Sequence, residues 1–162
     1  MVKQWTHKIF IGIIVSMAVM GMFIFPIFGK KPNPYAERDE KGNIVIKAAG
    51  LSTEKVSFIH IDEDSKIEIL AVLGDDDEIK IALGACQACG GSPYAYYIQK
   101  DDNLICNNCG LALPLSEIGE AGSGCHPIQI PEKIITKTEE DLVLNTEEIM
   151  KFETLFEKVI AH

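Results

Sequence analysis

The sequence predicts a mainly β protein with a C-terminal helix. Its small antiparallel sheet is expected to carry a zinc-ribbon-like double CxxC metal site, and one N-terminal transmembrane helix is expected to precede it. Three observations support this prediction. Short runs rich in Ile and Val alternate with polar clusters from residue 43 to residue 83, all five cysteines lie between Cys86 and Cys125, and one uncharged apolar run lies near the start. With 162 residues, the chain has room for one ordinary domain and an anchor.

Residues 1–29 are predicted to form the transmembrane anchor. The run from Ile9 to Phe28 has 20 residues and no charge, which is about the length of helix that crosses a bilayer. Trp5 precedes this run and Lys30 follows it, as interfacial residues do at the ends of membrane helices. A cleaved signal peptide is the alternative, but no small-residue cleavage site follows the run.

The orientation in the membrane does not follow from the charges, because lysines lie on both sides of the apolar run. Short N-terminal anchors commonly export a large C-terminal domain. We therefore expect a single-pass protein of the cell membrane, in contact with membrane lipid, with an extracytoplasmic domain. Residues 30–42 combine two prolines with dense charge and are predicted to be a linker.

Residues 43–136 are predicted to form a β-rich metal-binding domain. Alternation in one strand should place Ile67, Ile69, Ala71 and Leu73 on a single inward face. The expected strands are a first strand, an antiparallel meander of three strands, and a hairpin with one CxxC pair capping each of its strands: residues 43–48, 56–61, 66–73, 78–83, 94–99 and 103–105. His60 lies within one of these strand patterns and is expected in the core.

Residues 137–162 are predicted to form a C-terminal strand and helix that pack on this domain, after a short strand candidate at 130–136. Asn145, with Glu148 three residues later, is typical of a helix N-cap. The apolar residues that recur at helical spacing after it are Ile149, Phe152, Leu155, Phe156, Val159 and Ile160.

The charge of the chain argues against a nucleic-acid partner. The formal net charge is −9 and the pI is about 4.9, whereas phosphate binding requires clustered Lys and Arg. The acidic run from Asp75 to Asp77 lacks the ligand spacing of a calcium loop and predicts a solvated turn.

The cysteines form two CxxC pairs, Cys86/Cys89 and Cys106/Cys109, with 16 residues between the pairs. A CxxC turn lets two sulfurs face one metal ion while backbone N–H groups donate to them. A glycine just after each pair, Gly90 and Gly110, permits the positive φ that such a turn often needs. The spacing is typical of zinc ribbons and predicts a tetrahedral site formed by four thiolates.

Other uses of the two pairs fit less well. Covalent haem attachment needs a histidine directly after the second cysteine, and both pairs are followed by glycine. A thioredoxin-like dithiol needs a single CxxC at a helix N-terminus. Structural disulfides would not require the cysteines to be arranged as two CxxC pairs.

The spacing leaves the identity of the metal open, because four thiolates suit Zn(II), mononuclear iron and iron-sulfur clusters alike. Cys125 and His126 are surplus to a closed four-ligand zinc site, so both are further candidate ligands of a site that holds more than one metal atom or exchanges ligands. Their alternative interpretations are a buried thiol and a loop histidine with satisfied hydrogen bonds.

The order of the motifs resembles a known family. G-N-I-V-I is followed by A-C-Q-A-C, a tyrosine-rich strand, L-I-C-N-N-C-G, I-G and G-C-H-P-I. Over residues 42–131 this resembles the membrane iron-sulfur containing FtrD-like family, formerly a domain of unknown function. The resemblance implies an iron-sulfur or related centre held by five cysteines, in a membrane protein associated with iron uptake or electron transfer: Cys86, Cys89, Cys106, Cys109 and Cys125.

The leading functional hypothesis is therefore electron transfer at a membrane surface, linked to iron transport through a neighbouring transporter or redox partner. Metal capture or hand-over is one alternative, and a structural zinc ribbon that binds a membrane partner is another. No nucleophile-base pair, phosphate loop or carboxylate dyad predicts an independent enzyme, so no catalytic residue is assigned.

Overall fold

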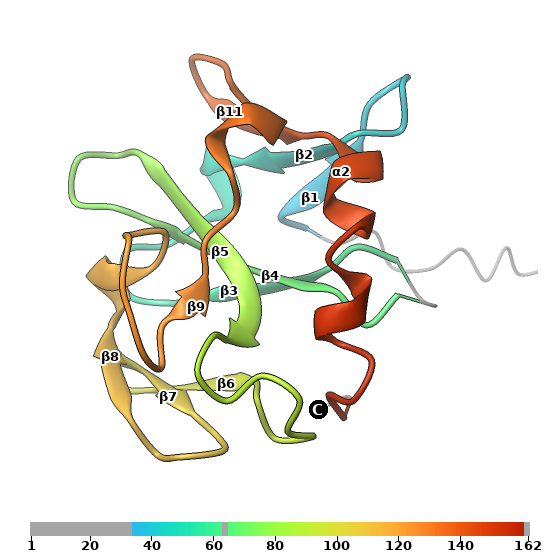
Figure 1. Ribbon diagram of the computed structural model, residues 1–162. Coiled ribbons are helices and arrows are strands. Elements are labelled where there is room, and N and C mark those ends of the chain that lie inside the picture. Colours follow the sequence, from blue (N-terminus) through green and yellow to red (C-terminus); the bar gives the residue numbers. More distant parts are fainter. Residues whose placement is uncertain (1–33, 63–64, 161–162) are drawn as a thin grey trace, which may run out of the picture. The chain divides into compact units, whose positions relative to one another are not determined.

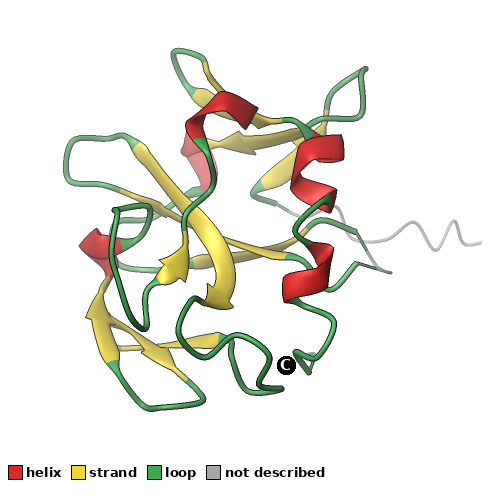
Figure 2. Ribbon diagram, viewed as in Figure 1, coloured by secondary structure: helices red, strands yellow, loops and turns green. Residues whose placement is uncertain are grey.

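The structure is a computed structural model that describes residues 34–62 and 65–160. Within these ranges the chain forms three small antiparallel sheets and one short C-terminal α-helix (Figures 1 and 2). This confirms the mainly β class with a C-terminal helix, but three sheets stand where one was predicted. The predicted anchor at residues 9–28 lies outside the described ranges. Within them, no helix has both the length and the apolar character needed to cross a bilayer.

The first sheet joins the two ends of the described chain, in the order β1-β2-β11-β10. Ala36 pairs with Ile46, and Leu142 pairs with the same residue from the other side. The first strand falls in the segment predicted to be a linker, but its backbone pairs with β2 and so becomes part of the sheet. The four strands are β1 Ala36–Arg38, β2 Ile44–Lys47, β10 Ile135–Lys137 and β11 Asp141–Leu144.

The second sheet contains the predicted meander, which the structure confirms, and adds a fourth short strand. Its order is β3-β4-β5-β9. The turn between β4 and β5 contains Asp77 at a positive φ of 62°, and Asp75, Asp76 and Asp77 are exposed as expected. The strands are β3 Ser57–His60, β4 Glu68–Leu73, β5 Ile79–Cys86 and β9 Pro127–Ile128.

The third sheet is the predicted hairpin extended by one further strand. Its order is β6-β7-β8, and Asp101 in the hairpin turn adopts a positive φ of 52°. Its strands are β6 Tyr97–Lys100, β7 Asn103–Cys106 and β8 Ala112–Pro114. Short 3₁₀ turns at Ala48–Gly50, Leu115–Glu117 and Glu132–Ile134 connect the elements.

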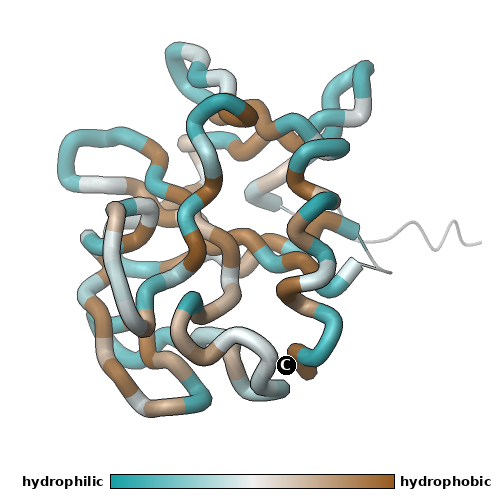
Figure 3. Tube along the Cα trace, viewed as in Figure 1, coloured by the Kyte–Doolittle hydropathy of each residue, from teal (hydrophilic) through white to brown (hydrophobic). Residues whose placement is uncertain are grey.

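The meander is buried on both of its faces. Ile67, Ile69 and Ala71 are buried as predicted and pack with the first sheet and the C-terminal segment. Leu70 and Val72 point the opposite way and are also buried, in a second core shared with the hairpin sheet and the cysteines. Figure 3 shows hydrophobic residues along the central strands and hydrophilic residues in the outer loops. The sheet therefore separates two cores.

The C-terminal helix begins as predicted but ends earlier. The Asn145 side chain accepts a hydrogen bond from the Glu148 N–H, and the helix α2 spans Thr146–Met150. A 3₁₀ turn, Glu153–Leu155, follows in place of further α-helix. Phe156 and Val159 follow this turn and are buried in the core, while Leu155 and Ile160 remain exposed.

A carboxylate is buried at the start of the central strand β4. Glu68 is only 3% exposed, and a Cβ added at Gly84 would lie 2.5 Å from its Oε1 atom, so a side chain at residue 84 would displace this carboxylate. His60, expected in the core, has a half-exposed side chain with Nε2 3.5 Å from Glu68 Oε2. Burial raises the pKa of Glu68 from 4.5 to about 8.

The free energy of unfolding should therefore fall as the pH rises from about 4.5 to about 8. In that window the folded protein keeps a proton on Glu68 that the unfolded chain has released. Glu68→Gln, which stays neutral, should raise this free energy at pH 9 by roughly 2–4 kcal/mol and change it little at pH 4. Denaturant unfolding of the full chain in detergent measures both values. An identical pH dependence in the two proteins would contradict the assignment.

Candidate metal centre

Three separate segments bring the cysteines together. Cys86 is the last residue of β5, Cys106 is the last residue of β7, and Cys125 lies just before β9. The prediction that each CxxC pair caps one strand of the hairpin is right for Cys106. It is wrong for Cys86, which ends a strand of the meander. The centre therefore lies where the second and third sheets meet.

The second pair forms a closed turn. Gly110 donates its N–H to the Cys106 carbonyl at 2.8 Å and has a φ of +76°, as predicted. The N–H groups of Asn108 and Cys109 donate to the Cys106 sulfur, and the N–H of Leu111 donates to the Cys109 sulfur. Such N–H···S bonds orient thiolates toward a metal ion.

The first pair is fixed by the loop that carries Cys125. The N–H of Gln87 donates to the His126 carbonyl at 3.0 Å, and that of Ala88 donates to the Gly124 carbonyl at 3.0 Å. The residue with positive φ after this pair is Gly91, at +86°, so the prediction for Gly90 is wrong by one position. The backbone pairing of β5 with β9 thus places Cys125 next to Cys86.

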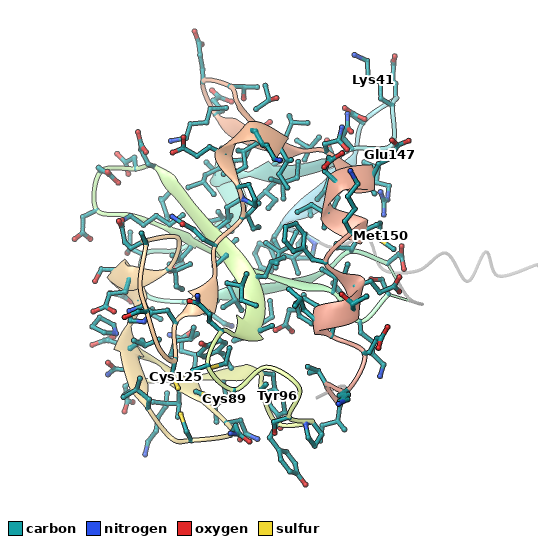
Figure 4. All side chains as sticks on the ribbon, viewed as in Figure 1. Lys41, Cys89, Tyr96, Cys125, Glu147 and Met150 are labelled. Atoms are coloured by element: carbon teal, nitrogen blue, oxygen red, sulfur yellow. The ribbon has the colours of Figure 1, made fainter. Side chains whose placement is uncertain are left out.

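Four sulfurs form a compact group. The Sγ atoms of Cys86, Cys89, Cys106 and Cys125 all lie within 4.8 Å of one another. The Cys89 sulfur is 3.8 Å from that of Cys106 and 3.8 Å from that of Cys125. Figure 4 shows Cys89 and Cys125 with their side chains side by side at this end of the molecule. All five cysteines are free thiols, so the structure contains no disulfide among them.

This donor set fits a thiolate-bound metal. Thiolates about 2.3 Å from one tetrahedral ion lie about 3.8 Å from each other, which matches the two Cys89 distances. A cluster spreads its thiolates over several iron atoms and so needs them further apart. The four sulfurs can therefore hold a single ion with little rearrangement, and a cluster by moving outward.

Cys109 lies beside this group rather than within it. Its sulfur is 3.2 Å from the Cys125 sulfur, and the residue is exposed. The geometry thus brings all five predicted cysteines together, but it pairs Cys125, rather than Cys109, with the other three. Proximity to Cys125 keeps Cys109 available as a fifth or exchanging ligand.

The surroundings of the sulfurs differ. Burial raises the pKa of Cys86, but the polar neighbours of its sulfur, among them the Tyr97 hydroxyl and the Cys89 N–H, outweigh burial and leave that pKa below 9.0. Burial raises the pKa of Cys106 to about 12, and the hydrogen bond with Cys109 raises that of Cys125. The Leu111 N–H lowers the pKa of Cys109 to about 7. The exposed thiol of Cys109 therefore ionises more readily than the buried thiol of Cys106.

His126 is adjacent to the centre in sequence but is held by other partners. Its Nδ1 atom lies 2.7 Å from the Ser123 carbonyl and its Nε2 atom 3.0 Å from a Glu117 carboxylate oxygen. Gly122 packs under the ring, since a Cβ there would lie 2.2 Å from it. The structure does not place His126 in the four-residue group, and its environment matches the alternative of a satisfied loop histidine.

Two residues that the sequence did not single out also shape the site. Glu117 fixes the His126 ring, and no spacing rule links residues nine apart across a loop. Tyr97 is fully buried, and its hydroxyl donates to the Cys125 carbonyl at 2.9 Å. Burial and the neighbouring cysteines raise the pKa of Tyr97. The alternation of Ala95, Tyr97 and Gln99 in the hairpin strand was a signal that Tyr97 faces inward.

Two serine variants should separate the ligand sets. Cys125→Ser should weaken metal binding about tenfold or more and remove one thiolate from the coordination sphere, whereas Cys109→Ser should change affinity about threefold or less. Co(II) titration of the reduced full-length protein measures both, because the intensity of the thiolate-to-cobalt absorption depends on the number of thiolates. A larger loss of affinity in Cys109→Ser than in Cys125→Ser would instead assign the site to the two CxxC pairs alone.

Comparison with protein families agrees with this geometry. A family model described as membrane iron-sulfur containing protein FtrD-like matches residues 51–156, a range that contains all five cysteines and more than half of the chain. Comparison with curated proteins and with solved structures finds no match. The chain belongs to the FtrD-like family of membrane iron-sulfur containing proteins.

Proposed function

We propose that this protein holds iron through its cysteine sulfurs and transfers electrons at a membrane surface. The observation that supports this most directly is the group of four sulfurs within 4.8 Å of one another, supplied by three segments. The description of the family as iron-sulfur containing supports iron as the metal. Cys86, Cys89, Cys106 and Cys125 hold the iron, as a single ion or a cluster, and Cys109 lies at its edge.

Iron held by thiolates exchanges single electrons at potentials set by hydrogen bonds to the sulfurs and by solvent exposure. The chain supplies both influences. Asn108 and Cys109 donate N–H groups to the Cys106 sulfur, which stabilises its negative charge. Cys86 and Cys106 are buried in the second core and exclude water on that side, while Cys109 is exposed. Electrons would enter and leave at the Cys109 edge.

The membrane location supports a redox partner within the bilayer. The family is described as membrane proteins, and the uncharged run from Ile9 to Phe28 has the length of one spanning helix. We place the domain on the extracytoplasmic side, next to a membrane transporter that handles iron or a redox protein that serves it. Protease treatment of intact spheroplasts tests this orientation, because an outward domain is digested and an inward domain is protected.

Metal hand-over is the second candidate function, and Cys109 favours it. An exposed thiol with a pKa near 7 beside Cys125 could take a metal ion from the four-sulfur group by ligand exchange. A structural zinc ribbon is the third candidate, since a tetrahedral four-thiolate group is typical of structural zinc. The three candidates differ in which metal is bound and in how readily it leaves.

The test is the metal content and colour of full-length protein purified without oxygen. Electron transfer predicts bound iron and a broad visible absorption that bleaches on chemical reduction and returns on reoxidation. Cys106→Ser is the control and should lose both iron and colour, because it removes a buried ligand. Colourless protein with tightly bound zinc would contradict the proposal, and iron that a mild chelator removes within minutes would favour hand-over.

A further inference from the structure

Residues 95–97, which lead into strand β6 between the two CxxC pairs, form backbone contacts with both pairs. Cys86 donates its N–H to the Ala95 carbonyl at 2.9 Å, and Asn107 donates to the Tyr96 carbonyl at 2.9 Å. Ala85 also forms a bridge with Tyr96. The backbone at residues 95–97 therefore lies between the two CxxC pairs.

The next side chain in this strand reaches all three cysteine segments. Tyr97 pairs with Cys106 in the register of β6 and β7. Its hydroxyl donates to the Cys125 carbonyl at 2.9 Å, and its ring packs in the same buried cluster as Cys86. No part of the side chain is exposed, so water does not compete for the hydroxyl's bond.

We propose that Tyr97 is a positioning residue of the metal centre: it holds the Cys125 loop against the segments that carry Cys86 and Cys106. The short strand β9 and two backbone bonds, from the N–H groups of Gln87 and Ala88, also hold this loop. The Tyr97 hydroxyl adds the bond to the carbonyl of Cys125 itself.

Tyr97→Phe tests this role, because it keeps the buried ring and removes only the hydroxyl. In the metal-free, reduced full-length protein, alkylation of Cys125 by iodoacetamide, located by mass spectrometry, should become about fivefold faster, the value of one lost hydrogen bond. Tyr94→Phe is the matched control: Tyr94 is three residues away and half-exposed, and its variant should alkylate at the wild-type rate. Equal Cys125 rates in all three proteins would overturn the positioning role.

Placing 3-fluorotyrosine at position 97 keeps the hydroxyl donor and the shape of the residue, also if the phenylalanine variant fails to fold. Cys125 in this protein should be alkylated no faster than in the wild type. A rate as fast as that of Tyr97→Phe would overturn the positioning role.

This inference rests on the proposed function only in naming the centre that Tyr97 positions. The alkylation rates need neither iron nor redox activity. Loss of Cys125 protection in Tyr97→Phe, together with absence of iron in wild type, would therefore reject the proposed function and leave the positioning role standing.

Discussion

The convergence of three cysteine segments is the constraint on which the architecture of this domain depends. Cys86 ends a strand of the meander, Cys106 ends a strand of the hairpin, and Cys125 enters through the loop before β9. The first and last of these segments belong to the meander sheet and the second belongs to the hairpin sheet, so a metal bound by their sulfurs would fasten the two sheets together. Because ligation contributes directly to the free energy of folding, such a centre would stabilise an interface that short strands alone hold weakly.

The two-sided meander explains how a small domain can accommodate the centre. One face packs on the first sheet and the C-terminal segment, in an aliphatic core around Ile69 and Phe156. The opposite face packs on the hairpin in a core that includes Leu70, Cys86 and Cys106. The first core provides stability that does not depend on metal, and the second places sulfur at one end of the sheet. Glu68 lies at the start of the central strand β4, where its burial links stability to pH.

Much of the fold was predictable because local patterns determined it. Strand periodicity located the meander and the hairpin, the Asn145 cap located the start of α2, and Gly110 marked the second knuckle. The helix length was not predictable, because the apolar spacing after Met150 is compatible with both α and 3₁₀ geometry. In the structure, a 3₁₀ turn follows the helix. The pairing of Ala36 with Ile46 was hidden by charged neighbours that suggested a linker.

For the site, spacing predicted which cysteines come together but not how they are grouped. A CxxC pattern places two sulfurs in one turn, and it cannot show that a distant β5-β9 pairing brings Cys125 closer to the group than Cys109. The partners of His126 and the hydroxyl contacts of Tyr97 depend on loops that pack across the domain, so no local pattern encodes them. The long-range backbone pairing that brings these segments together could not be predicted from the sequence.

X-ray absorption at the edge of the bound metal tests the central claim most directly, because it identifies the atoms next to the metal whatever that metal is. For full-length protein purified without oxygen, the account predicts a nearest shell made entirely of sulfur. A nearest shell dominated by oxygen or nitrogen would show that the sulfurs of the three segments do not hold a common centre.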